Sequence, residues 1–158
     1  MHYLVNLMNN LSGYCHPFLQ PEQVTVITGS QLEMLQVLIA DDQIKVRRAL
    51  RLLLEQQPGL ALAGAAADAQ ALLALLKQCC PDLALLDWEL PGADLADLIL
   101  ELRKTCPDLY VIALGGQPHV DPADLLATGA NTFVSKADPP ERLLAAIQDF
   151  VHQKNTRK

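Results

Sequence analysis

Residues 82–116 read DLALLDWELPGADLADLILELRKTCPDLYVIALGG, and this stretch decides the fold because it predicts a strand, a helix and a second strand in succession. The runs 82–87 and 109–114 are short and apolar without alternation, which is typical of strands buried on both faces. Between them, residues 94–106 place leucines at helical spacing and stop before a proline. The pattern predicts parallel strands joined by a helix, with the carboxylate of Asp87 at the end of the first strand.

The same alternation continues on both sides of this stretch. Asp68, Asp94 and Asp121 each stand where a helix begins, and aspartate is a favoured residue at that position. Five strands alternate with five helices over residues 36–153, which predicts a doubly wound α/β fold with one parallel sheet. The other predicted strands cover 36–40, 60–65 and 131–135, and the other predicted helices cover 43–57, 68–79, 121–129 and 139–153.

Composition limits the classes of function. The chain has 158 residues, 51% of them hydrophobic, which suits one domain with an aliphatic core. The formal net charge is −6, and all 18 acidic residues but only 9 of the 12 basic residues lie before residue 151. A body of that charge repels nucleic-acid and membrane phosphates, which argues against direct DNA binding by the domain. No apolar run approaches the roughly 20 residues that span a bilayer.

Neither the two ends of the chain nor the four cysteines carry a recognisable functional motif. Residues 1–35 follow no steady period and are interpreted as a weakly structured extension, and residues 154–158 as a basic tail or the start of a linker. No export signal precedes the domain, so a cytoplasmic location is expected. The four cysteines lack metal-ligand spacing, which favours reduced thiols.

Charged residues follow the predicted strands where the strands end. Asp41 and Asp42 follow the first strand, Asp87 ends the third, Gly115 breaks the fourth and Lys136 follows the fifth. The carboxyl ends of parallel strands meet at one edge of a sheet, so these residues are expected to converge. Three neighbouring carboxylates repel one another unless a cation is present, and hard oxygen donors suit Mg²⁺. Because aspartate is also a nucleophile toward phosphorus, the pattern indicates a Mg²⁺-dependent phosphoryl acceptor.

Each of these residues also has a purely structural interpretation. An Asp-Asp pair after a strand is more often a helix cap and turn, and Asp87 before Pro-Gly can simply begin a turn. Lys136 alone reads as a solvated charge. Asp82 and Asp108, which each follow a proline, are interpreted as turn residues. The convergence of several charges at one edge is what favours a functional site.

Residues 36–153 resemble the receiver domain of bacterial two-component response regulators. VLIADDQ (37–43) matches the acidic pair of that family, LALLDWELPG (83–92) its phospho-acceptor motif, and GANTFVSKADPPERLLAAI (129–147) its closing motif. The sequence of these residues is most similar to receivers that precede a LuxR-type helix-turn-helix domain. The resemblance implies a flavodoxin-like fold with a five-stranded sheet in the order 2-1-3-4-5.

The resemblance also implies a role for each matching residue. Asp87 would accept a phosphoryl group from a sensor histidine kinase. Asp41 and Asp42 would hold Mg²⁺, with the main-chain carbonyl of Glu89 as a further ligand. Lys136 would pair with a phosphoryl oxygen.

The sequence departs from the family at the switch position. The family normally ends the fourth strand with Thr or Ser, whose hydroxyl couples the phosphoryl group to an aromatic residue. Here Gly115 stands at that place and Phe133 at the aromatic position. Phosphorylation remains chemically feasible, but switching through a hydroxyl is not expected.

The preferred hypothesis is a phosphorelay signalling module that is not an enzyme. After Phe150 only eight residues remain, too few for a helix-turn-helix unit. Either regulation of transcription uses an output domain absent from this chain, or the chain is a stand-alone receiver that works through partners. Homodimerisation is an expectation from the family. One alternative is a degenerate receiver that binds a protein partner without phosphorylation, motivated by Gly115. Another is a haloacid-dehalogenase-type phosphatase, which needs a second Asp where this chain has Glu89.

Overall fold

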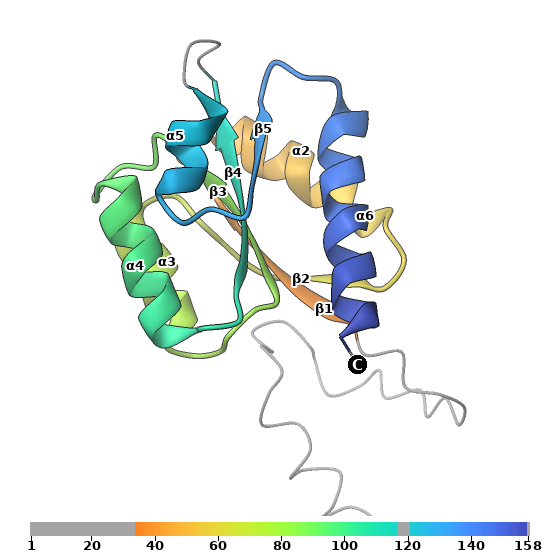
Figure 1. Ribbon diagram of the computed structural model, residues 1–158, viewed down its shortest axis with the longest axis horizontal. Helices are drawn as coiled ribbons and strands as arrows, with labels where there is room; N and C mark the ends of the chain where they lie inside the picture. Colours follow the sequence, from red (N-terminus) through yellow and green to blue (C-terminus); the bar gives the residue numbers. More distant parts are fainter. Residues whose placement is uncertain (1–33, 117–120, 158) are drawn as a thin grey trace, which may run out of the picture.

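The computed structural model describes residues 34–116 and 121–157, so the expected extension over 1–35 lies outside it except for residues 34 and 35. The described residues form five strands that alternate with five helices (Figure 1), which confirms the predicted fold class. In chain order these are β1 Leu35–Ala40, α2 Ile44–Glu55, β2 Leu60–Ala66, α3 Ala69–Leu76, β3 Leu83–Asp87, α4 Leu95–Thr105, β4 Tyr110–Gly115, α5 Pro122–Ala127, β5 Thr132–Ser135 and α6 Pro140–Thr156.

The strands form a single parallel sheet in the order β2-β1-β3-β4-β5, as the resemblance implied. The direction of winding reverses between β1 and β3, which is where open α/β sheets place their sites. At this point Ala40 pairs with Leu86. The residues that follow them, Asp41 and Asp87, therefore emerge side by side.

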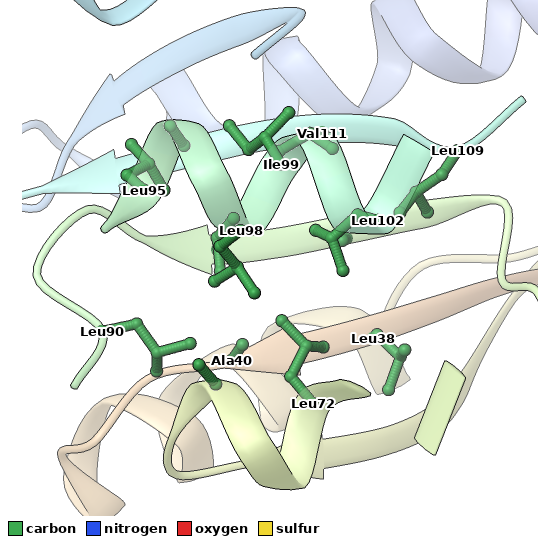
Figure 2. Close-up of a cluster of buried hydrophobic side chains, with 14 of the residues drawn as sticks. Leu38, Ala40, Leu72, Leu90, Leu95, Leu98, Ile99, Leu102, Leu109 and Val111 are labelled. Atoms are coloured by element: carbon green, nitrogen blue, oxygen red, sulfur yellow. The ribbon is translucent and has the colours of Figure 1, made fainter. Parts of the chain in front are cut away.

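Two hydrophobic layers hold the sheet. Helices α3, α4 and α5 cover one face and α2 and α6 cover the other (Figure 1). Along β1, Leu38 and Ala40 belong to the first layer, whereas Val37 and Ile39 belong to the second. Burial on both faces explains why the strands read as continuous apolar runs. Figure 2 shows the first layer, where leucines of α3 and α4 pack over the strands.

Side-chain caps define where three of the helices begin. Asp68 accepts a hydrogen bond from the N–H of Ala71 (2.8 Å), and Asp94 accepts one from Ala96 (3.0 Å). Asp121 caps α5 in the same way. Each cap satisfies an N–H that has no partner within its helix, and such caps contribute about 1 kcal/mol each.

Helix α6 continues to Thr156, further than the predicted residue 153. Lys154, which was expected in a solvated tail, therefore lies in the helix, and its Nζ is 3.0 Å from Oδ1 of Asp82. The other carboxylate oxygen of Asp82 accepts the N–H of Gln36 at 2.8 Å. Asp82 thus links the start of β1 to the end of α6, so its interpretation as a simple turn residue was incomplete.

Cys80 and Cys106 form a disulfide, so the expectation of reduced thiols was wrong for this pair. Helix α3 ends at Leu76 rather than at residue 79, which leaves Cys80 in the loop before β3. Cys106 caps the end of α4, and the two Cα atoms are 5.5 Å apart. Cys80 precedes β3 and Cys106 precedes β4. The disulfide therefore lies at the amino ends of the strands, whereas Asp87 lies at their carboxyl ends.

The first hydrophobic layer is expected to dominate stability. Leu102 on α4 is fully buried (Figure 2), whereas Leu100 on the same helix is 56% exposed. We expect Leu102→Ala to lower the free energy of unfolding by about 2–5 kcal/mol, because it removes buried methyl groups and leaves a cavity. Leu100→Ala is the matched control and should change it by less than about 0.5 kcal/mol. Urea denaturation measures both, and equal losses would contradict this packing.

Candidate phosphoryl and metal site

Three carboxylates meet at the carboxyl edge of the sheet. Asp41 and Asp42 follow β1, and Asp87 is the last residue of β3. Each contributes a carboxylate oxygen that lies within 4.8 Å of the other two. Asp41 is fully buried and Asp87 is only 3% exposed, whereas Asp42 is exposed. The structure therefore brings together the three acids that the sequence placed at strand ends.

Lys136 joins this cluster from the residue after β5. Its Nζ is 2.6 Å from Oδ2 of Asp41 and 3.0 Å from Oδ1 of Asp87. Burial alone lowers the pKa of Lys136, but the hydrogen bonds and negative charges of Asp41 and Asp87 outweigh this effect and raise the pKa. Lys136 therefore stays protonated at neutral pH and lies between the two buried carboxylates.

The charges of the cluster do not balance. Three carboxylates and one ammonium have a formal charge of −2, and two of the carboxylates, those of Asp41 and Asp87, are buried. A divalent cation would neutralise this charge, and carboxylate oxygens with one exposed member, Asp42, match the preference of Mg²⁺ for oxygen ligands and retained water. The donor set thus fits the metal that the sequence predicted.

Arg47 of α2 orients the acidic pair Asp41 and Asp42, a role that the sequence analysis did not predict. One guanidinium nitrogen, Nη1, donates to the main-chain oxygens of Asp41 (2.6 Å) and Asp42 (2.9 Å). The N–H of Gln43 donates to Oδ1 of Asp41 at 2.9 Å. These bonds fix the β1–α2 loop. An arginine in the second turn of the helix after an acidic pair is the signal that could have found it.

The loop after β3 fixes the position of Asp87. The N–H of Glu89 donates to Oδ1 of Asp87 (3.2 Å), and the N–H of Trp88 donates to the carbonyl of Leu114 on β4 (2.7 Å). Gly92 has φ of +100°, a conformation that favours glycine and lets the chain turn toward α4. The metal-ligand role of the Glu89 carbonyl stays a prediction.

Gly115 and Phe133 lie against each other beside this cluster. Gly115 is the last residue of β4, one residue beyond the predicted end of that strand. A Cβ atom built on Gly115 would lie 2.7 Å from Cε2 and 3.0 Å from Cζ of Phe133. The aromatic ring therefore occupies the space that a side chain at position 115 would need.

Trp88 offers a direct measurement of metal binding. It is the single tryptophan of the chain, follows Asp87 and lines an open hollow beside the β3–α4 loop. We expect Mg²⁺ to change its fluorescence along a saturable curve, because the ion alters the field next to the indole. Asp42→Asn should weaken the Mg²⁺ affinity by about tenfold or more. Asp97→Asn, on the exposed side of α4, is the control. Unchanged affinity in Asp42→Asn would contradict a metal site here.

Comparisons with known proteins match this chain to one family profile and to parts of longer proteins. The sequence profile described as the response regulator receiver domain matches residues 37–148. The chain is 32% identical over 114 residues to the nitrate/nitrite response regulator protein NarP of Escherichia coli (strain K12), covering 72% of this chain and 53% of that protein. It is 30% identical over 132 residues to a protein-glutamate methylesterase/protein-glutamine glutaminase of Trichodesmium erythraeum (strain IMS101), covering 75% and 38%.

Solved structures agree. A two-component response regulator of the LuxR family from Aurantimonas sp. SI85-9A1 superposes with a TM-score of 0.67 at 27% identity, covering 75% of this chain and 85% of that one. The chain spans about half, or less, of the length of the two curated relatives. Among the described residues, no helix has the length and apolar character needed to cross a bilayer.

Proposed function

The chain belongs to the response regulator receiver domain family of two-component signalling, and on that premise we propose that Asp87 accepts a phosphoryl group from a sensor histidine kinase in a Mg²⁺-dependent way. One observation supports this more than any other. Asp87 is almost fully buried, yet it lies between a protonated lysine and two further carboxylates. A structural aspartate has no need of such surroundings, whereas a phosphoryl acceptor does.

The proposed reaction transfers a phosphoryl group from a histidine nitrogen of the kinase to a carboxylate oxygen of Asp87. A carboxylate oxygen of Asp87 attacks phosphorus, an O–P bond forms, and the bond from phosphorus to the leaving histidine nitrogen breaks, with its electron pair going to that nitrogen. Lys136, already 3.0 Å from Asp87, would pair with an oxygen of the incoming group. The N–H of Glu89 would keep Asp87 oriented.

Three side chains would hold the ion. Asp41, Asp42 and Asp87 supply the carboxylate oxygens, and we assign the main-chain carbonyl of Glu89 as a further ligand. When bound, Mg²⁺ supplies positive charge to the oxygens of the phosphoryl group. Arg47 keeps the loop of the acidic pair in place through its two carbonyl contacts.

The wider role follows from the same proposal. The receiver would run from β1 to α6, so that Leu35 and residues 154–156 belong to it, and the residues before 34 would form an extension. The receiver would act as a phosphoryl acceptor and not as an enzyme, which is the role we propose for residues 36–153. Contact with DNA would go through an output domain outside this chain, and homodimerisation stays a family expectation.

We place the chain in the cytoplasm. Disulfides persist mainly in oxidising compartments, so the bond between Cys80 and Cys106 does not itself favour this location. Because that bond lies at the opposite edge of the sheet, its opening should leave the geometry of the acidic cluster unchanged.

The test is direct phosphorylation. The full chain is incubated with Mg²⁺ and acetyl phosphate, and the intact mass is recorded. We expect a gain of one phosphoryl group that disappears when EDTA removes the metal. An unchanged mass at saturating Mg²⁺ and donor would overturn the proposal.

A second candidate function rests on Gly115. Because no hydroxyl is present at the end of β4, the chain could serve as a phosphorylation-independent interaction module. In that case Asp87→Ala would leave the oligomeric state and partner affinity unchanged. An altered affinity in that variant would exclude this candidate.

A further inference from the structure

The disulfide between Cys80 and Cys106 closes a loop of the chain that contains Asp87. The two cysteines are 26 residues apart in the sequence, and the residues between them include all of β3 and all of α4. A cross-link of this kind restricts the unfolded chain and so stabilises the folded state. Forming or opening the bond therefore changes the stability of the domain without touching the carboxyl ends of the strands.

The two cysteines have different surroundings. Cys80 lies in the loop before β3 and is exposed, whereas Cys106 is 3% exposed and belongs to the first hydrophobic layer. A thiolate breaks a disulfide by attacking one sulfur, and the other sulfur leaves. The exposed cysteine is therefore the point of attack, and the buried one is the leaving group. The released thiol of Cys106 suits the apolar layer, since a thiol packs like a small hydrophobic group.

The backbone keeps both cysteines in place without help from the disulfide. The N–H of Tyr110 donates to the carbonyl of Asp82, two residues after Cys80, at 3.0 Å. At the other cysteine, the N–H of Leu109 donates to the carbonyl of Cys106 at 3.1 Å. Neither hydrogen bond involves a sulfur atom. The two thiols therefore stay close to each other after reduction, and the bond can form again.

We propose that Cys80 and Cys106 form a reversible thiol–disulfide exchange site, which responds to dithiol reductants and sets the stability of the domain. A thiolate of the dithiol attacks Sγ of Cys80, the bond between the two cysteines breaks, and Cys106 leaves with its electron pair and takes a proton from water. The second thiolate of the dithiol then attacks the reductant sulfur bound to Cys80 and releases the Cys80 thiol. The dithiol is oxidised to a disulfide, and two electrons pass to the cysteine pair.

This site accounts for a disulfide in a chain that we place in the cytoplasm. Disulfides in reducing compartments are mainly transient and serve catalysis or redox sensing. An exposed disulfide is also reduced more readily than a buried one. The inference rests on the fold and on the two cysteines, so it does not depend on whether Asp87 accepts a phosphoryl group.

Reversibility is tested in the full chain with Cys15→Ser and Cys79→Ser, a two-cysteine chain that keeps Cys80 and Cys106. The folded protein is treated with oxidised glutathione, then dithiothreitol, then oxidised glutathione again, and its thiols are counted by intact mass after maleimide labelling in urea. We expect no label, two labels and again no label. A pair that dithiothreitol leaves closed, or that oxidised glutathione leaves as two thiols or two glutathione adducts, would overturn the proposal.

The point of attack is tested with two single-cysteine variants of that chain. Cys106→Ser leaves Cys80, and Cys80→Ser leaves Cys106. We expect N-ethylmaleimide to label Cys80 in the folded protein at least about tenfold faster than Cys106, because only Cys80 is exposed. In urea both should react at the same rate, which is the control for intrinsic reactivity. Equal rates in the folded protein, or a faster Cys106, would show that attack does not enter through Cys80.

The effect on stability is tested by thermal melting. The oxidised form of the two-cysteine chain should melt at least roughly 5 °C above its reduced form, because the cross-link restricts the unfolded state. The chain in which Cys80 and Cys106 are also replaced by serine is the control, and dithiothreitol should not change its melting temperature. Equal melting temperatures of the oxidised and reduced forms would overturn the claim that this pair sets the stability of the domain.

Discussion

Replacing Asp87 with alanine is expected to abolish the phosphoryl adduct, lowering its rate of formation by at least about a thousandfold. The reason is chemical, because the carboxylate oxygen is the nucleophile and no other group replaces it. Asp42 is an exposed acid in the same cluster, but the ammonium of Lys136 contacts Asp41 and Asp87. Intact mass after incubation with acetyl phosphate and Mg²⁺ measures the effect.

Asp97→Ala is the matched control for this loss. Asp97 is an exposed aspartate in the first turn of α4 and lies outside the acidic cluster. Its variant should form the adduct at the wild-type rate. An adduct that persists in Asp87→Ala would show that another residue accepts the group.

Replacing Lys136 with methionine is expected to destabilise the metal-free protein by about 3 kcal/mol. The fully buried carboxylate of Asp41 would lose the ammonium 2.6 Å away, and breaking one partner of a buried pair costs about 3–5 kcal/mol. The lower end applies because the side chain of Lys136 is 20% exposed. Mg²⁺ should restore more stability to this variant than to the wild type, since the ion replaces the missing charge.

Urea denaturation with EDTA and with Mg²⁺ separates the two contributions. Lys104→Met is the control, because Lys104 pairs with Glu101 on the surface and both side chains are more than half exposed. Its loss should stay below about 1 kcal/mol and should not respond to Mg²⁺. Equal losses in the two variants would contradict the charge balance described for the acidic cluster.

The order and type of the elements could be predicted because each element carries its signal locally. Strands such as β3 read as apolar runs since both faces are buried, and Asp94 and Asp121 mark the starts of helices through their own caps. The contact between Asp82 and Lys154 and the disulfide of Cys80 could not be predicted. Both join segments that are distant along the chain, and no local pattern shows which loops meet.

The residues of the site could be predicted where they stand at strand ends, but their contacts with other segments could not. Asp41, Asp87 and Lys136 stand at strand ends, and the topology of a parallel sheet is enough to bring strand ends together. The sequence also showed that a hydroxyl is missing at Gly115. It could not show that the ring of Phe133 fills the vacant space, because that contact depends on the register between β4 and β5.

The most direct measurement locates the phosphoryl group on the chain. After reaction with acetyl phosphate and Mg²⁺, borohydride reduces an aspartyl phosphate to homoserine, which tandem mass spectrometry of the peptides assigns to one position. Homoserine at position 87, lost when EDTA is present, is the predicted result. Homoserine at position 42 or elsewhere, or none at all, would show that the buried carboxylate beside Lys136 is not a phosphoryl acceptor.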